Sequence, residues 1–228
     1  MNPNFKELQD YIAKMEEFKL PDYKELPPIP LYMEQVVSYV TESLDVLYTN
    51  SQQVLTPFMV NNYVKAKIVM PPKHKKYSRD HVGYLLSISL LKSVVSMRDI
   101  ATLIELDKRF TNDKQMLYKY FKDMQDDVIK NEAHRVRARL DTLSKVSQKK
   151  SKRKSDKDKS VDEEMMSLAY VALRLYTESE TTKLIADNIM SRISEAVLPK
   201  KALKESKKEK KFEKKKLVNE ASKIGDNR

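Results

Sequence analysis

The chain has 228 residues, of which 40% are hydrophobic and 34% charged, and its formal net charge is +11. This length and composition predict one or two folded domains rather than a disordered chain. The absence of cysteine excludes disulfides, thiolate nucleophiles and zinc–cysteine sites. The only two glycines, Gly83 and Gly225, are too few for a glycine-rich phosphate-binding loop.

The positive charge is concentrated in two lysine-rich segments. Residues 145–159 carry a net charge of +6 and residues 199–228 carry +7, which leaves −2 for the rest of the chain. We expect a solvated basic linker over residues 147–159 and a disordered tail over residues 199–228. The overall basicity is therefore weak evidence for nucleic-acid binding by the folded part.

The sequence contains no recognisable targeting or membrane segment. The amino terminus lacks the basic and apolar stretches of a signal peptide, and the longest apolar stretch, residues 83–91, is too short to span a bilayer. We expect a cytoplasmic protein with no membrane partner.

Apolar residues at helical spacing predict a mainly α fold. A first helix is followed by a proline-rich lead-in that completes an N-terminal segment over residues 1–30. Thr56 before Pro57 combines a capping hydroxyl with proline at the first helical position, which predicts the start of a short helix. Pro71 and Pro72 mark its end. The helices expected in the first half of the chain cover residues 5–18, 31–48, 57–70, 78–95 and 97–106.

The second half of the chain predicts longer helices. Residues 112–146 fit one long helix, or two that break near Asn131, and such a length favours dimerisation as a coiled coil. Ser160 and Glu163 form a capping-box pattern after the basic linker. We expect a helical hairpin over residues 160–198, with its second helix near residues 180–197.

Side chains suited to catalysis or metal binding do not form a motif. The three histidines, His74, His81 and His134, are far apart in sequence, and none belongs to a metal-binding pair of known spacing. Acidic pairs lie on predicted helices beside lysines, where solvated ion pairs are the usual arrangement. We therefore expect no enzymatic activity, no metal and no cofactor.

The segment around the helix that starts at Pro57 combines side chains that suit DNA. Asparagine pairs with adenine edges in the major groove, and lysines contact phosphates. Asn61 and Asn62 are the candidate base contacts. The candidate backbone contacts are Thr56, Tyr63, Lys65, Lys67, Lys73, Lys75, Lys76, Tyr77 and Arg79. Composition alone leaves open that these are ordinary exposed polar residues, and that Tyr63 belongs to the core.

The stretch TPFMVNNYVKAKIVMPPKHKKYS resembles the DNA-binding half of MerR-type regulators, which pair a helix-turn-helix with a small basic wing. Ile68 and Val69 correspond to paired leucines before a proline, and Tyr77-Ser78 to the end of the wing. The chain departs from the pattern at Asn61, where an arginine is expected, and at Lys67, where a glycine is expected. Residues 27–107 are also similar to an uncharacterised bacterial family defined by a domain of unknown function.

The resemblance implies a winged helix-turn-helix over residues 31–107 that binds double-stranded DNA, and a dimer helix over residues 112–146. A homodimer would bind a two-fold related operator at the nucleoid and regulate transcription, with an unknown effector or protein partner. Two alternatives remain. The helix-turn-helix could bind another protein, or the basic linker and tail could bind nucleic acid without sequence preference.

Overall fold

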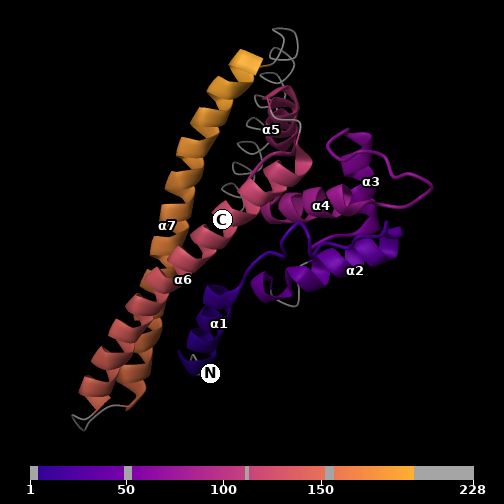
Figure 1. Cartoon of the computed structure of the whole chain (residues 1–228). Helices are drawn as coiled ribbons and strands as arrows, with labels where there is room; N and C mark the ends of the chain where they lie inside the picture. The colour runs from indigo at the N-terminus through magenta and orange to yellow at the C-terminus, as the bar shows by residue number, and fades with distance from the viewer. Residues whose placement is uncertain (1–4, 49–52, 111–112, 152–156, 198–228) are drawn as a thin grey trace, which may run out of the picture. The chain divides into compact units, whose positions relative to one another are not determined.

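The computed structural model describes residues 5–48, 53–110, 113–151 and 157–197, and this part of the chain is mainly helical (Figure 1). The helices are α1 (Phe5–Glu17), α2 (Met33–Ser43), the 3-10 helix η1 (Asp45–Leu47), α3 (Pro57–Lys65), α4 (Arg79–Leu91), α5 (Met97–Phe110), α6 (Lys114–Ser151) and α7 (Lys157–Val197). The chain divides into two compact units, residues 1–181 and 182–228, and the boundary lies within α7.

The main hydrophobic core is formed by α2 to α5 together with the segments on either side of them. Leu86 of α4 is fully buried at its centre. Leu20 and Leu26, which precede α2, belong to the same core, and so do Tyr118 and Phe121 of α6. The packed region is therefore wider than the predicted 31–107, because apolar side chains of the lead-in and of the long helix complete it.

The proline-rich lead-in is irregular in structure but firmly attached to the helices. The Tyr118 hydroxyl donates a hydrogen bond to the carbonyl oxygen of Pro21 at 2.9 Å. Farther along, Leu31 and Tyr77 exchange two backbone hydrogen bonds, each 2.8 Å long. These two residues form an isolated antiparallel bridge that joins the lead-in to the segment before α4.

A smaller apolar cluster holds α1 along α6 (Figure 1). Ile12 of α1 is buried with Ala133 and Leu140 of α6, and Leu168 of α7 packs against them. A polar contact lies beside this cluster, because His134 Nδ1 is 2.7 Å from a carboxylate oxygen of Glu16. The cluster confirms the predicted amphipathic helix over residues 5–18 and gives its apolar face a partner.

The predicted long helix is confirmed as α6, which begins at Lys114 and runs without a break through Asn131. The helices enter the predicted linker from both ends, and residues 152–156 lie outside the described part. The predicted hairpin over residues 160–198 is wrong, because α7 is one continuous helix that begins before Ser160. Its sequence contains neither glycine nor proline, so nothing interrupts the backbone hydrogen bonds. The predicted tail, residues 199–228, lies outside the described residues.

None of the described helices combines the length and the apolar character needed to cross a bilayer.

Candidate functional site

Helix α3 begins as the sequence predicts. The hydroxyl of Thr56 accepts a hydrogen bond of 3.2 Å from the backbone N–H of Met59, and Pro57 occupies the first turn. The cap satisfies one of the N–H groups that a helix leaves free at its start. The start of this short helix is therefore fixed by its own sequence.

The two faces of α3 have different roles. Val60 and Tyr63, three residues apart, are buried in the main core. Asn61 and Asn62 are exposed on the other side. Tyr63 retains only 7% of its accessible surface, so the prediction that it contacts a DNA backbone is wrong. Its ring instead anchors the helix, and the anchoring presents the two asparagines to solvent.

The end of α3 is closed by a Schellman motif with lysine in the place of glycine. The N–H of Ile68 donates to the carbonyl oxygen of Tyr63, and the N–H of Lys67 donates to that of Val64, both at 3.0 Å. This motif requires a left-handed residue, usually glycine, and Lys67 adopts it with φ of 59°. Position 67 is therefore one that favours glycine, although it is occupied by lysine.

A two-residue turn follows, between Lys73 and Lys76. These two residues exchange backbone hydrogen bonds of 2.9 and 3.1 Å. The central residues, His74 and Lys75, have φ of 50° and 63°. Positive φ at both central positions is typical of a type I′ turn, which favours Asn-Gly or Gly-Gly. The described residues contain this turn and isolated bridges but no strand, so the segment predicted as a wing forms a tight turn without a two-stranded ladder.

Lys67, His74 and Lys75 are the non-glycine residues with positive φ in the described part of the chain. All three are exposed, and they lie in a segment, residues 56–79, that contains no Asp or Glu. A side chain in the left-handed region costs about 1–2 kcal/mol relative to the right-handed one. Strain of this kind clusters at functional sites. We call the exposed residues Asn61, Asn62, Lys65, Lys67, Lys73, His74 and Lys75 the basic edge.

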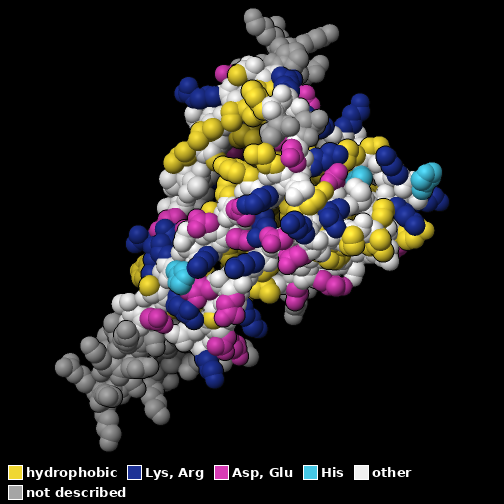
Figure 2. All heavy atoms as spheres, in the orientation of Figure 1, with side chains coloured by type: hydrophobic (Ala, Val, Ile, Leu, Met, Phe, Trp, Pro, Cys, Tyr) yellow, Lys and Arg dark blue, Asp and Glu magenta, His cyan; other side chains and the backbone are white. Residues whose placement is uncertain are grey.

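Figure 2 shows lysine and arginine side chains with a histidine at the right of the view, over the turn between α3 and α4. Lys76 is half-buried, and its Nζ lies 4.9 Å from the centre of the Tyr32 ring. The guanidinium of Arg79 is similarly placed 5.4 Å from the centre of the Tyr23 ring. Both cations are thus partly engaged in packing, whereas those of the basic edge are exposed.

Tyr77 is the second predicted backbone contact that the structure contradicts. It is only 3% exposed, and its ring stands edge-on to that of His81 with 5.5 Å between the centres. Its backbone bridge to Leu31 and its buried ring make it a structural residue. It fixes the distal end of the two-residue turn, which keeps Lys75 at the surface.

His81 holds the basic edge in place, a role that was not predicted from the sequence. Its Nδ1 accepts a hydrogen bond of 3.0 Å from the backbone N–H of Ser78, and its Nε2 lies 3.2 Å from the carbonyl oxygen of Met70. Because Nδ1 accepts this hydrogen bond, it carries no proton, and the ring is neutral with its proton on Nε2. The sequence signal was the pattern Ser-x-x-His, a capping box with histidine in place of Glu or Gln.

The pH dependence of stability should report on His81. Burial lowers the pKa of His81 from its ordinary value of 6.5, while Asp80 raises it and Lys114 lowers it by smaller amounts. Below pH 6.5 the unfolded chain therefore binds a proton that the folded chain excludes. The free energy of unfolding should fall as the pH is lowered. Urea unfolding measured between pH 7.5 and 5 tests this expectation.

The matched variant is His81→Gln, because glutamine keeps the capping acceptor but does not titrate. We expect a shallower decline of the unfolding free energy with decreasing pH than in the parent protein. The control is His74→Gln, which removes an exposed histidine of the neighbouring turn and should leave the parent profile unchanged. Equal pH profiles for the parent and His81→Gln would contradict the role of His81.

No group of three His, Asp or Glu side chains close enough to hold a metal ion occurs among the described residues.

The main core and the basic edge together coincide with a known domain. Residues 21–124 match the model of DUF1836, a domain of unknown function. The DUF1836 region begins beside the buried Leu20 and ends just after the buried Phe121, so its limits follow those of the main core. The predicted resemblance to a family defined by a domain of unknown function is confirmed for this region. No curated protein and no solved structure matches the chain.

Proposed function

We propose that the chain is a sequence-specific DNA-binding transcriptional regulator with a MerR-like winged helix-turn-helix, acting at the nucleoid in the cytoplasm. The observation that carries the proposal is the basic edge, in which Lys67, His74 and Lys75 occupy positions that favour glycine. Glycine there would relieve strain. Basic side chains at positions of this kind support a role in binding a polyanion.

Helix α3 would enter the major groove. Its buried residues Val60 and Tyr63 fix its orientation, which leaves Asn61 and Asn62 free to reach base edges. The turn at residues 73–76 would act as the wing, with lysines on phosphates. The absence of acidic residues over 56–79 supports this assignment, because a carboxylate within the edge would repel the phosphate backbone.

A homodimer through α6 would give the operator two-fold symmetry. Met116, Tyr120, Met124 and Val128 recur every four residues along this helix, and each is between 48% and 71% exposed. Side chains four residues apart lie on the same face of a helix. An apolar row of this kind supports pairing with a second copy.

The first test is a selection of the full-length protein against random duplex DNA, followed by affinity measurements on the enriched site. We expect a palindromic site. Asn61→Ala should relax the preference at one base of each half-site, by about 1–3 kcal/mol. Asn131→Ala, which removes an exposed asparagine of α6, is the control and should leave the preference unchanged.

The alternatives give different results. A chain that ends at residue 198 lacks the lysine-rich tail, and its specific binding should persist if the basic edge makes the contacts. If deletion of the tail abolishes all binding and the full chain enriches no sequence, the chain binds DNA without sequence preference. A helix-turn-helix that serves a protein partner would enrich no DNA sequence with or without the tail. An unchanged base preference in Asn61→Ala would refute the role of that residue.

A further inference from the structure

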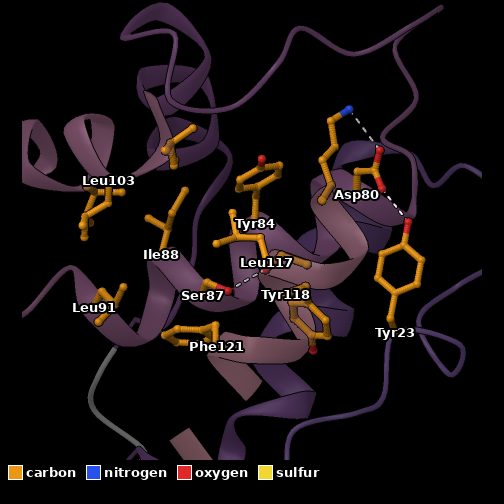
Figure 3. Close-up of a pocket in the computed structure, with 14 residues that line it drawn as sticks. Tyr23, Asp80, Tyr84, Ser87, Ile88, Leu91, Leu103, Leu117, Tyr118 and Phe121 are labelled. Carbon is orange, nitrogen blue, oxygen red and sulfur yellow. Dashed lines mark hydrogen bonds and ion pairs between the residues drawn. The ribbon is translucent and has the colours of Figure 1, made fainter. Parts of the chain in front are cut away.

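A cavity of about 130 Å³ lies between α4, α5 and α6, away from the basic edge (Figure 3). Its walls are mostly aliphatic and aromatic. The apolar lining includes Ile88 and Leu91 of α4, Leu103 and Ile104 of α5, and Leu117 and Phe121 of α6. Gly83 of α4 allows the Tyr118 ring of α6 to approach closely, because a Cβ at this position would lie only 3.0 Å from Cδ2 of Tyr118.

The volume of the cavity fits one six-membered ring. An engineered cavity of about 150 Å³ with leucine, isoleucine and phenylalanine walls stays dry and binds benzene. Side chains of the same types surround this cavity, together with the rings of Tyr84 and Tyr118. Aromatic rings pack favourably edge-to-face or offset against one another. Size and walls both point to a single aromatic ring.

The polar end of the cavity is electrically balanced. Lys114 Nζ is 3.2 Å from one carboxylate oxygen of Asp80, and the Tyr23 hydroxyl donates to the other at 2.5 Å. Burial opposes ionisation of Asp80, but the hydrogen bonds from Tyr23 and Lys114 hold its pKa below the ordinary value. Figure 3 shows Asp80 and Tyr23 together at one end, and Leu91 and Leu103 at the other. A ligand with a net charge would face one partner of an existing ion pair and disturb it.

Tyr84 lines the cavity and offers a hydrogen-bonding group. Its hydroxyl makes no hydrogen bond to any described residue, although the hydroxyls of Tyr23 and Tyr118 both do. Burial raises the pKa of Tyr84, so the hydroxyl stays protonated near neutral pH and can donate. A ligand with one acceptor atom would accept a hydrogen bond from it.

We propose that this cavity binds a neutral, single-ring aromatic molecule that carries one hydrogen-bonding substituent, a compound of the phenol class. The ring occupies the apolar end between α4, α5 and α6, and its substituent meets the Tyr84 hydroxyl. The binding is independent of the proposed DNA contacts, because the cavity and the basic edge share no residue.

The test is a titration of the full-length protein with phenol. Calorimetry measures the binding, and thermal unfolding measures the shift in Tm. Saturable binding at one site per chain is expected, with a Tm that rises with phenol concentration. Benzoate has a ring of the same size and a negative charge, and it should bind at least tenfold more weakly. Absence of saturable phenol binding to the folded protein would overturn the proposal, and equal binding of benzoate would overturn the assignment to neutral ligands.

Two variants locate the site. Leu103→Trp places a larger side chain at the rim of the cavity, where 38% exposure leaves room for it, and should abolish phenol binding. Val94→Trp is the control, since Val94 is 46% exposed and outside the cavity. Tyr84→Phe should weaken phenol binding about 2- to 10-fold and leave toluene binding unchanged, because it removes only the hydroxyl. Phenol binding that persists in Leu103→Trp would place the site elsewhere and refute the proposal.

Discussion

Replacement of Lys67, His74 and Lys75 by glycine, asparagine and glycine should make the protein more stable and its DNA binding weaker. All three residues have positive φ. Glycine and asparagine tolerate this region, and Asn-Gly is the preferred pair in a type I′ turn. We expect the free energy of unfolding to rise by about 1–3 kcal/mol, from the relief of side-chain crowding in the left-handed region.

The loss of DNA binding follows from the charges removed. Each lysine that neutralises a phosphate contributes about 0.9 to the slope of log affinity against log salt. The loss of Lys67 and Lys75 should therefore lower the magnitude of that slope by about 1.8 and the affinity by roughly tenfold per lysine near 0.1 M salt. Fluorescence anisotropy over a series of salt concentrations measures both quantities.

Alanine at the same three positions separates charge from conformation. It removes the same charges but leaves a Cβ in the left-handed region, so DNA binding should fall equally while stability shows no comparable gain. If the glycine variant binds DNA as tightly as the parent, the basic edge does not contact phosphates. If the glycine variant is no more stable than the alanine variant, the positive φ values carry no cost.

Local signals in the sequence predicted the elements that a few neighbouring residues determine. Thr56 and Pro57 fix the start of α3, and apolar spacing placed α1, α2, α4, α5 and the long α6. The error in α7 is also local. A second helix of a hairpin was predicted near residues 180–197, but the residues before it contain no glycine or proline and are compatible with one continuous helix. The lysine-rich segment has good helix propensity, which explains why helix extends into it.

The remaining features depend on contacts that a local pattern does not encode. Tyr63 and Tyr77 were predicted to contact DNA because tyrosine is a residue type that does so. Both side chains are instead buried in the main core. The strain at Lys67 arises because the chain must leave α3 sharply so that Ile68 can turn back into the core. Residues of α4, α5 and α6 line the cavity together, so the sequence pattern of a single helix does not predict it.

The lead-in before α2 gives the largest expected loss of stability. Leu26 is fully buried, and its Cδ1 lies 3.6 Å from where a Cβ of Gly83 would be. Leu26→Ala should lower the free energy of unfolding by about 2–5 kcal/mol, because it leaves a void between the lead-in and α4. Urea unfolding of the full-length protein measures the change.

Ile29→Ala is the matched control, since Ile29 lies in the same segment and is 68% exposed. Its effect should stay within about 0.5 kcal/mol. Equal effects of the two substitutions would show that the lead-in does not stabilise the core. A large effect of Leu26→Ala alone would instead agree with a DUF1836 match that begins at residue 21 and not at the predicted residue 27, because a domain cut at 27 would lack both Leu26 and the hydrogen bond from Tyr118 to Pro21.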